Sequence, residues 1–472
     1  MSSLVVVEFP WGRDKDPRVP LGHASLIAVL QSMNIEYISI VREINADGFN
    51  TTEILKEILA LVNDDSMIAI GAYVWAEDAI QYLMSGLRRS GFNGRIVLGG
   101  PQISYMSDGL EATYPHADIF VRGYGELALA GLALNHDEEI RGVHRAGEED
   151  FAEQTEVDLP MMPSPWLTNV IDLKTQKFVR WESQRGCPFK CGFCQHKEPG
   201  ARLKKREFAP ERINKEIDLF CELGVEDIAV LDPIFNASSQ SLAILRRFIA
   251  NAYTGKLSLQ CRAEMIDDEF LDAVEQLNVR LEFGLQTIHR IEGKAVSRNN
   301  NIDKVDTVLK EVTKRRINYE ITLIYGLPEQ SLESFKHTVS WCLKHNVPTI
   351  KAFPLMLLRG TDVANRKHEW DLTESSGSMP VVLSSNTFTF NDWLAMARLS
   401  EALKKTEDHH PSSIEELEHI AATCEVDATR YSPKPAKEIQ FRSLSMPSRT
   451  AIDGALVTAY ADRISRMCSI FG

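Results

Sequence analysis

The segment Arg185-Gly186-Cys187-Pro188-Phe189-Lys190-Cys191-Gly192-Phe193-Cys194 carries three of the eight cysteines of this 472-residue chain. Thiolates this close in sequence can hold three corners of an iron–sulfur cluster or three positions of a zinc ion. No fourth cysteine is near, and His196 is the local candidate for a fourth ligand. The C-x3-C-x2-C spacing therefore predicts a metal centre with one open position. The alternatives are a zinc site completed by His196 and a chance cluster of buried cysteines.

The motif, with the aromatic Phe193 directly before its last cysteine, resembles the signature of the radical S-adenosylmethionine (SAM) superfamily. The resemblance implies that Cys187, Cys191 and Cys194 hold a [4Fe–4S] cluster. It also implies that the fourth iron binds the amino and carboxylate groups of SAM, whose reductive cleavage yields a 5′-deoxyadenosyl radical. An external electron donor of the flavodoxin or ferredoxin type is then expected as a partner.

The composition is ordinary for a globular protein, with 44% hydrophobic and 25% charged residues. The net charge of −14 and the lack of a long basic run argue against nucleic acid or an anionic membrane as a partner. No apolar run is long enough to span a bilayer, and the N-terminus lacks the features of a signal peptide. The remaining cysteines are scattered. We therefore expect a cytoplasmic protein with reduced thiols.

Residues 1–145 alternate between buried strands and amphipathic helices, which predicts a Rossmann-like, doubly wound parallel sheet with helices on both faces. Ligands of such sheets bind beyond the carboxyl ends of the strands. The expected strands are Leu4–Phe9, Ile35–Val41, Met67–Val74, Arg95–Leu98 and Ile119–Val121.

Glycine-rich segments follow these strands, and glycine lets the backbone approach a ligand closely. Their order, ahead of a radical SAM motif, resembles the cobalamin-binding domain of class B radical enzymes. The resemblance implies cobalamin contacts from Tyr73, Trp75, Gly99, Gly100, Pro101, Gln102, Gly123 and Glu126.

The Asp-x-His-x-x-Gly motif that supplies a cobalt ligand in other cobalamin proteins is absent. The lower axial position of the cobalt is therefore unassigned. His23 is a candidate, although a solvated or capping role is the simpler expectation for this histidine. A Rossmann-like domain that has lost its ligand remains an alternative.

Residues 146–176 are acidic and then proline-rich, which predicts an extended linker laid across the second domain. Residues 177–362 read as six strand–helix units, a partial (β/α)6 barrel of the radical SAM type with its site at the strand ends. The expected strands are Lys177–Ser183, Asp227–Leu231, Leu257–Cys261, Arg280–Phe283, Tyr319–Ile324 and Thr349–Pro354.

Polar side chains at these strand ends suit SAM, because acids can bind the ribose diol and Arg or amide groups can bind the carboxylate. Each is also a plausible structural hydrogen-bonding group, and Arg262 could simply pair with Glu264. Together with the family layout they imply SAM contacts from Phe193, Asp232, Arg262, Glu264, Gln286 and Arg298.

Residues 363–472 are expected to form a small, mostly helical region that shapes the substrate pocket. Helices are predicted over Leu394–Lys404, Ile414–Thr423 and Ala451–Met467.

The main hypothesis is a cobalamin-dependent radical SAM methyltransferase acting on an unactivated carbon or phosphorus centre of a small-molecule or peptidic substrate. One alternative keeps the radical chemistry but performs a rearrangement, cyclisation or redox step without methyl transfer. Another is a non-catalytic cobalamin or nucleotide sensor with a structural metal site.

Overall fold

The N-terminal unit is a six-stranded sheet in the order β2-β1-β3-β4-β5-β6. A computed structural model of the chain describes residues 3–134, 140–174, 176–196 and 205–431. Strands β1 to β5 are parallel, and the edge strand β6 runs antiparallel to β5. The strands are β1 Leu4–Glu8, β2 Ile38–Val41, β3 Met67–Gly71, β4 Arg95–Gly99, β5 Ile119–Val121 and β6 Val143–Arg145.

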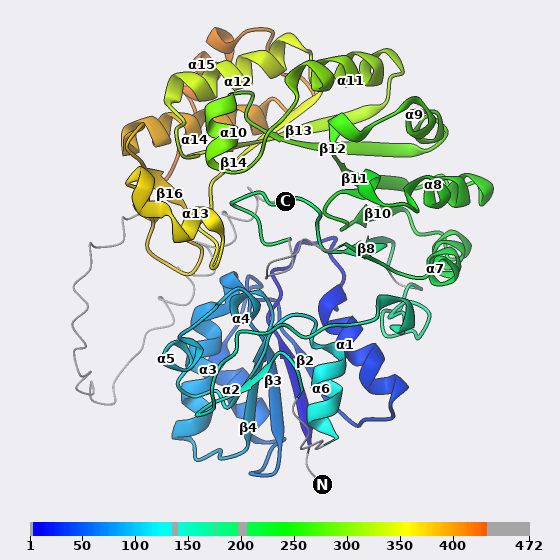
Figure 1. The fold of residues 1–472 in the computed structure, drawn as a ribbon, viewed down its shortest axis with the longest axis vertical. Coiled ribbons are helices and arrows are strands. Elements are labelled where there is room, and N and C mark those ends of the chain that lie inside the picture. The colour runs from blue at the N-terminus through cyan, green and yellow to red at the C-terminus, as the bar shows by residue number, and fades with distance from the viewer. Residues whose placement is uncertain (1–2, 135–139, 175, 197–204, 432–472) are drawn as a thin grey trace.

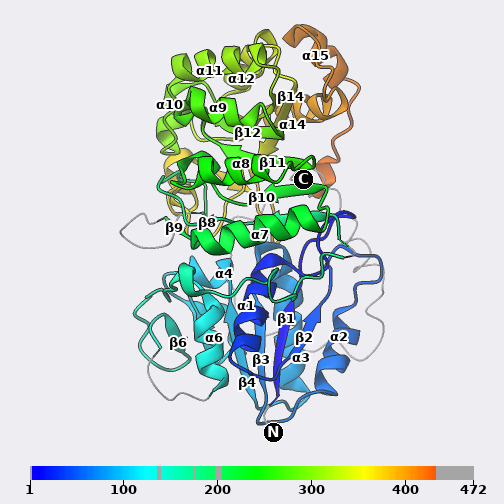
Figure 2. The same cartoon turned by 90° about the vertical axis from the view of Figure 1, so that its right-hand side faces the viewer.

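Both faces of this sheet are covered by helices, as the sequence predicts (Figures 1 and 2). In β1, Val5 and Val7 pack into one hydrophobic cluster, whereas Leu4 and Val6 pack into another. A strand buried on both faces needs such a continuous apolar run. One face carries α2 (Thr51–Leu59) and α3 (Glu77–Arg89), and the other carries α1 (Leu21–Ser32) and α6 (Gly125–Ala133).

The strand order places a topological switch point between β1 and β3. The chain leaves β1 toward β2 on one side and returns to β3 on the other. Connections on opposite faces of the sheet open a crevice at this point, outside the carboxyl ends of the strands. The expected doubly wound sheet is therefore confirmed. The carboxyl ends of its parallel strands, which we call its ligand edge, point toward the second unit in Figure 1.

The second unit is a six-stranded, all-parallel open barrel in the order β7-β10-β11-β12-β13-β14. Each expected strand is present, and β7 and β14 remain the two open edges. The strands are β7 Phe178–Trp181, β10 Asp227–Val230, β11 Lys256–Cys261, β12 Asn278–Gln286, β13 Asn318–Tyr325 and β14 Thr349–Pro354. The helices between them are α7 Pro210–Glu222, α8 Ser241–Ala250, α9 Asp268–Val274, α10 Arg290–Ala295, α11 Ile302–Lys314 and α12 Leu332–Lys344.

A short hairpin that the sequence did not predict flanks the cysteine motif. Strand β8 (Gln184–Arg185) pairs antiparallel with β9 (Arg206–Glu207). The motif leaves the hairpin directly after β8, so the hairpin fixes where the cysteine loop begins.

The segment after β6 contacts both units. Thr155 donates its hydroxyl to the Arg122 and Tyr124 carbonyls in the N-terminal unit, at 2.7 and 2.6 Å. Further along, the Trp166 ring packs edge-on against Phe220 of α7, with centroids 5.5 Å apart. The segment contains a 3-10 turn, Leu159–Met161, and a second turn in which the Asn169 N–H donates to the Trp166 carbonyl at 3.1 Å.

In the C-terminal region, α14 (Phe390–Lys405) packs against the edge strand β14 and α12, and α15 (Ile414–Ala421) packs against α14 and α12. Helix α14 begins at Phe390, four residues before the sequence-based start, because Thr389 and Asp392 form a capping box. A small hairpin of β15 and β16 was also not predicted. The predicted helix Ala451–Met467 lies outside the described residues. The described elements are α13 Asp362–Asn365, β15 Thr373–Glu374, β16 Val382–Ser384, α14 Phe390–Lys405 and α15 Ile414–Ala421.

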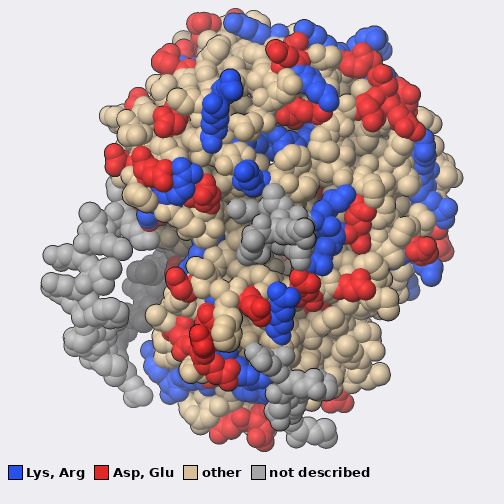
Figure 3. Space-filling view, in the orientation of Figure 1, with Lys and Arg blue, Asp and Glu red and all other residues tan. Residues whose placement is uncertain are grey.

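The surface carries charges of both signs. Figure 3 shows Lys and Arg side chains interspersed with Asp and Glu over the described residues of the face in view. Among the helices of the described ranges, none combines the length and the apolar character that a membrane crossing requires.

Two glycines with similar backbone angles allow a test of whether the turn after β4 depends on close backbone packing. Gly100 has φ +98°, and a Cβ there would lie 2.9 Å from the Ala72 carbonyl oxygen. Gly91 has φ +90°, with open space around it. Alanine strains both sites, but only Gly100→Ala also meets fixed backbone. We predict that Gly100→Ala lowers the free energy of unfolding by about 1–3 kcal/mol more than Gly91→Ala, measured by denaturant unfolding. Equal losses would contradict this packing.

Candidate active site

A cavity of about 440 Å³ lies where the two units meet. In the N-terminal unit its wall includes Glu8, Gly71, Gly99 and Val121, at the carboxyl ends of four parallel strands. From the barrel it is closed by residues that follow β7 and β10 and by two residues that follow the last motif cysteine. These barrel residues are Glu182, Gln184, Arg185, Gly186, Gln195, His196, Leu231 and Pro233. The strand ends of both units therefore border one cavity.

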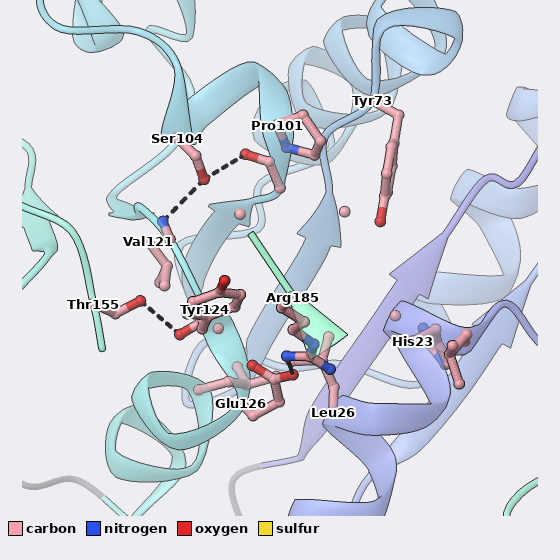
Figure 4. A pocket seen from close by; sticks show the side chains of 18 of the residues that line it. His23, Leu26, Tyr73, Pro101, Ser104, Val121, Tyr124, Glu126, Thr155 and Arg185 are labelled. Atoms are coloured by element: carbon pink, nitrogen blue, oxygen red, sulfur yellow. Dashed lines mark hydrogen bonds and ion pairs between the residues drawn. The ribbon is translucent and has the colours of Figure 1, made fainter. Parts of the chain in front are cut away.

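An ion pair joins the two sides of this cavity (Figure 4). The Arg185 Nη1 lies 2.5 Å from Glu126 Oε1 on α6, and its Nη2 lies 2.7 Å from Glu182 Oε1. The side chains of Arg185 and Glu126 are 13% and 7% exposed, so the pair is largely removed from water. Burial works to lower the pKa of Arg185, but the charges of Glu126 and Glu182 outweigh it and raise that pKa. Arg185 is therefore a fixed cation two residues before the first motif cysteine.

Six of the eight residues predicted to contact cobalamin line the cavity. The Tyr73 ring extends from the end of β3 toward the start of α1, where a Cβ on Gly22 would lie 3.4 Å from the tyrosine hydroxyl. The other predicted residues on the wall are Gly99, Gly100, Pro101, Gly123 and Glu126.

Trp75 and Gln102 are not part of the cavity wall, and their assignment as cobalamin contacts stays a prediction. The Trp75 indole stacks on Tyr73 and donates to the Phe9 carbonyl at 2.9 Å. Gln102 is buried on α4 (Pro101–Ser104) and donates to Glu77 Oε2 at 3.0 Å. Pro101 and Ser104 sit one helical turn apart and face the cavity, and Gln102 lies between them on the other side of the helix.

The three motif cysteines lie in one loop whose backbone is tied to the barrel. The Gly192 N–H donates to the Val296 carbonyl at 2.7 Å, and the Gly192 carbonyl accepts from the Val363 N–H at 3.0 Å. Cys187 is buried, whereas Cys191 and Cys194 are half-buried. Burial, together with the nearby Cys191 and Cys187 thiols, raises the pKa of Cys194 to about 11. The three thiols therefore share one environment. Over the described ranges, no three His, Cys, Asp or Glu side chains form a site for a single metal ion.

Four of the predicted SAM contacts surround the barrel side of this loop. The Arg298 Nη1 lies 3.9 Å from Cys191 Sγ, and its Nη2 donates to the Gly284 carbonyl. The Arg262 guanidinium lies 4.1 Å from the centre of the Phe189 ring and 3.6 Å from Glu264 Oε1. Gln286 adopts φ +67° at an irregularity in β12, and its Oε1 is buried without a hydrogen-bond partner among the described residues.

The remaining two predicted SAM contacts differ. Phe193 is partly buried and packs against the barrel core. Asp232 is fully buried, and its carboxylate accepts from the Ser183 N–H at 2.7 Å, the Gln184 N–H at 3.2 Å and the Ser183 hydroxyl. Burial raises the pKa of Asp232 to about 7, although these hydrogen bonds oppose the shift. The carboxylate of Asp232 therefore holds the chain that leads into the cysteine loop, and its contact with SAM stays a prediction.

Comparison with known proteins agrees with this layout. Residues 181–342 match the family described as the Radical SAM superfamily. The chain carries a radical SAM domain. The resemblance drawn from the cysteine motif is confirmed, and such a domain uses a [4Fe–4S] cluster and SAM.

Two curated relatives extend the similarity beyond this domain. The 2-(S-pantetheinyl)-carbapenam-3-carboxylate methyltransferase of Streptantibioticus cattleyicolor is 28% identical over 320 residues, 61% of this chain and 46% of that protein. The cobalamin-dependent radical SAM methyltransferase TokK of Streptomyces tokunonensis is 25% identical over 319 residues, with the same coverage of 61% and 46%. The chain thus spans less than half the length of these relatives.

Solved structures share the fold of both units. The radical SAM methyltransferase TsrM of Kitasatospora setae superposes with a TM-score of 0.62 at 14% identity, covering 78% of this chain and 76% of TsrM. The cobalamin-dependent SAM radical enzyme OxsB superposes with a TM-score of 0.64 at 15% identity, covering 85% of this chain and 66% of OxsB. The fold of the N-terminal sheet followed by the radical SAM barrel is therefore that of these enzymes.

The residues beside the cysteine loop of the radical SAM domain fit the amino-acid end of SAM. Burial, and then the charge of Arg298, lower the pKa of Arg262, so two guanidinium groups lie near each other. A carboxylate is the natural partner for such a pair. The unpaired Gln286 Oε1 offers an acceptor to an ammonium group. Three thiolates leave the fourth iron of a cubane cluster free to bind the same end of SAM.

The cavity wall also fits a ligand that is rich in amide groups. His23 Nδ1, Gln154 Oε1 and Gln184 Oε1 are buried without hydrogen-bond partners among the described residues, and all three residues line the cavity. Buried polar groups normally find partners, so unpaired atoms on a cavity wall suit a polar ligand. The corrin ring of cobalamin carries carboxamide side chains at its rim, which can donate to such atoms.

His23 itself is neither solvated nor a helix cap, contrary to the sequence-based expectation. It is 1% exposed, its Nε2 lies 2.7 Å from Ser39 Oγ, and burial lowers its pKa to about 4. It is therefore a neutral imidazole in the wall of the cavity.

Sequence reasoning missed Arg185, Glu182 and Glu8, which also line this wall. Arg185 lies inside the cysteine motif, but the sequence does not indicate that it pairs with Glu126 of α6. Glu8 ends the first strand and is 4% exposed. No hydrogen bond or ion pair of its carboxyl is found within the described residues, and burial raises its pKa to about 8. The sequence signal that could have identified Glu8 is its position, since it is a carboxyl group at the end of a buried parallel strand.

The raised pKa of Glu8 predicts how stability depends on pH. The unfolded chain ionises this group near pH 4.5, whereas the folded protein keeps it protonated up to about pH 8. Its contribution is fully present below pH 4.5 and is lost as the pH rises to 8, by at most about 1.4 kcal/mol per pH unit. Glu8→Gln cannot ionise, so we predict that it becomes steadily more stable relative to the wild type between pH 5 and pH 8.

Denaturant unfolding at four pH values in this range measures the effect. Glu53→Gln is the matched control, because the Glu53 side chain is 64% exposed on α2. Parallel pH profiles for Glu8→Gln and the wild type would contradict the prediction.

Proposed function

We propose that the protein is a cobalamin-dependent radical SAM methyltransferase that methylates an unactivated carbon or phosphorus centre. The observation that carries this proposal is the shared cavity, in which the ligand edge of the N-terminal sheet faces the cysteine loop through Gln195 and His196. A methyl donor bound at the first and a radical generated at the second would then act on one substrate. The carbapenam methyltransferase, TokK and TsrM are all described as methyltransferases, and this similarity supports methyl transfer.

The residues of the chain would bind and orient these groups. Cys187, Cys191 and Cys194 would hold the cluster, while Arg262, Arg298 and Gln286 would fix the amino-acid end of SAM. The strand ends from Glu8 to Glu126 would hold cobalamin and exclude water. When bound, the cluster and SAM supply a 5′-deoxyadenosyl radical, and methylcobalamin supplies the methyl group.

The substrate is proposed to be a small molecule or a peptide, and the electron donor a flavodoxin or ferredoxin. The region after Thr361 is proposed to shape the substrate pocket, because its α14 packs against the barrel through the Ser400 hydroxyl, which donates to the Ala352 carbonyl of β14 at 2.7 Å. We also expect the protein to act in the cytoplasm.

The products of SAM distinguish methyl transfer from the alternatives. With cluster, hydroxocobalamin, a reductant and substrate candidates present under anaerobic conditions, we predict that 5′-deoxyadenosine and S-adenosylhomocysteine both form. Methyl transfer consumes one SAM as the radical source and one to remethylate the cobalt. 5′-Deoxyadenosine without S-adenosylhomocysteine would contradict methyl transfer and support a rearrangement or redox step. Neither product, with both cofactors bound, would support a sensor.

The cluster assignment predicts opposite results for two cysteine variants. Cys191→Ala should lose most of its iron and sulfide after anaerobic reconstitution and its 5′-deoxyadenosine formation, because one corner of the cluster has no thiolate. Cys221→Ala is the matched control, since Cys221 is a half-buried free cysteine on α7. Iron and sulfide analysis measures both. Full cluster content in Cys191→Ala would contradict the assignment.

A further inference from the structure

The residue after the last motif cysteine is held by both units of the protein. The Gln195 carbonyl accepts a hydrogen bond from the Tyr105 hydroxyl of the N-terminal unit. The Gln195 side-chain amide donates to the Arg359 carbonyl at 2.8 Å, in the segment that follows β14. The end of the cysteine loop therefore depends on two contacts that are distant in sequence.

The Arg359 side chain reaches into the N-terminal unit. Its Nη1 donates to the Tyr114 hydroxyl at 2.7 Å and lies 3.3 Å from the Gln102 carbonyl. Glu77 lies behind these partners, since its Oε2 accepts from the Tyr114 hydroxyl at 2.9 Å and from the Gln102 amide at 3.0 Å. Its Oε1 is 3.8 Å from Arg359 Nη2. The guanidinium thus meets three acceptors that hydrogen-bond to one another, of which Tyr114 and Gln102 are buried and Glu77 is partly buried.

The next residue brings the two backbones into contact. Gly360 adopts φ +68°, and a Cβ there would lie 2.0 Å from the Tyr105 carbonyl oxygen. Only glycine allows this approach. Arg359 and Gly360 together therefore dock the exit of β14 on the end of α4.

Helix α4 also forms part of the cavity wall. Pro101, Ser104 and Tyr105 line the cavity, while the Gln102 carbonyl contacts Arg359 on the other side of the helix. One short element therefore touches the proposed cobalamin cavity, the β14 exit and the end of the cysteine loop.

We propose that Arg359 is a positioning residue that sets where the cysteine loop stands relative to the ligand of the cavity. It acts through α4 and Gln195, and Arg359 itself is not part of the cavity wall. The inference rests on the proposed function in one respect, that cobalamin is the ligand of the cavity. We call the contacts of Arg359 with Glu77, Gln102, Tyr105, Tyr114 and Gln195, direct or through Gly360, the Arg359 junction.

Hydrogen–deuterium exchange of the cluster-loaded protein without cobalamin is the first test. Arg359→Ala should raise exchange about tenfold in two separate segments, residues 101–106 and 191–196, because it removes the hydrogen bonds to Tyr114 and Gln102 that hold the Gln195-bound segment against α4. Arg359→Lys should recover only part of the protection, since an ammonium has no second nitrogen to lie near Glu77 Oε1 as Arg359 Nη2 does, at 3.8 Å. Tyr114→Phe removes one hydroxyl and serves if Arg359→Ala does not fold.

The second test measures the placement directly. Pulsed dipolar electron paramagnetic resonance between cob(II)alamin and the reduced cluster should give one narrow distance distribution in the wild type and a broader or displaced one in Arg359→Ala. The matched control is Arg366→Ala, because Arg366 forms its ion pairs with Asp362 and Glu369 on the same exit segment. It should leave both readouts unchanged.

The outcomes separate the two proposals. Wild-type exchange and a wild-type distance in Arg359→Ala, with both cofactors loaded, would overturn the role of Arg359. Failure of the wild type to bind cobalamin would overturn the proposed function. In that case the exchange measurement still decides whether Arg359 joins α4 to the cysteine loop.

Discussion

The largely buried ion pair between Arg185 and Glu126 is the contact on which the arrangement of the two units most depends. It crosses the cavity from β8, just before the cysteine loop, to the first turn of α6. A carboxylate in that turn is favoured by the helix dipole, and Glu182 gives the guanidinium a second partner. Removing one member of such a pair leaves an uncompensated charge away from water. The pair therefore fixes the start of the cysteine loop against the ligand edge of the N-terminal sheet.

Parallel topology explains why this edge is available. In both sheets the connections run back over the faces, so the carboxyl ends of the strands collect at one side. The two units turn these sides toward each other, with Arg180 of β7 also binding Asp16 after β1 at 2.8 Å. Two sites that each lie at strand ends thus become one cavity. The Arg359 junction holds the opposite end of the same loop, so both ends of the cysteine motif are tied to the N-terminal unit.

Much of this could be predicted from the sequence, because the decisive signals are local. Apolar runs located the strands of both sheets, and the C-x3-C-x2-C spacing identified the cluster loop. Gly100 and Gly123 were recognisable because glycine marks backbone that packs closely. The edge strand β6 was missed, since only one of its three residues, Val143, is apolar.

Side-chain direction and distant partners could not be predicted. Trp75 and Gln102 follow the right strands but face away from the cavity, which depends on the turn geometry after each strand. Asp232 carries the right chemistry for a ribose, yet Ser183 and Gln184 occupy its carboxylate. The sequence predicts a solvated or capping His23, but in the fold this side chain is buried against Ser39 of β2. Each of these contacts joins residues that are far apart in sequence.

The central claim is that cobalamin binds in the cavity between the ligand edge of the N-terminal sheet and the cysteine loop that holds the radical SAM cluster. Anomalous diffraction at the cobalt and iron absorption edges, from crystals of the protein loaded with both cofactors, tests it most directly. The account predicts an iron peak beside Cys187, Cys191 and Cys194 and a cobalt peak inside the cavity between Gly100 and Arg185. A cobalt peak outside this cavity, or no cobalt peak in protein that carries the cluster, would contradict it.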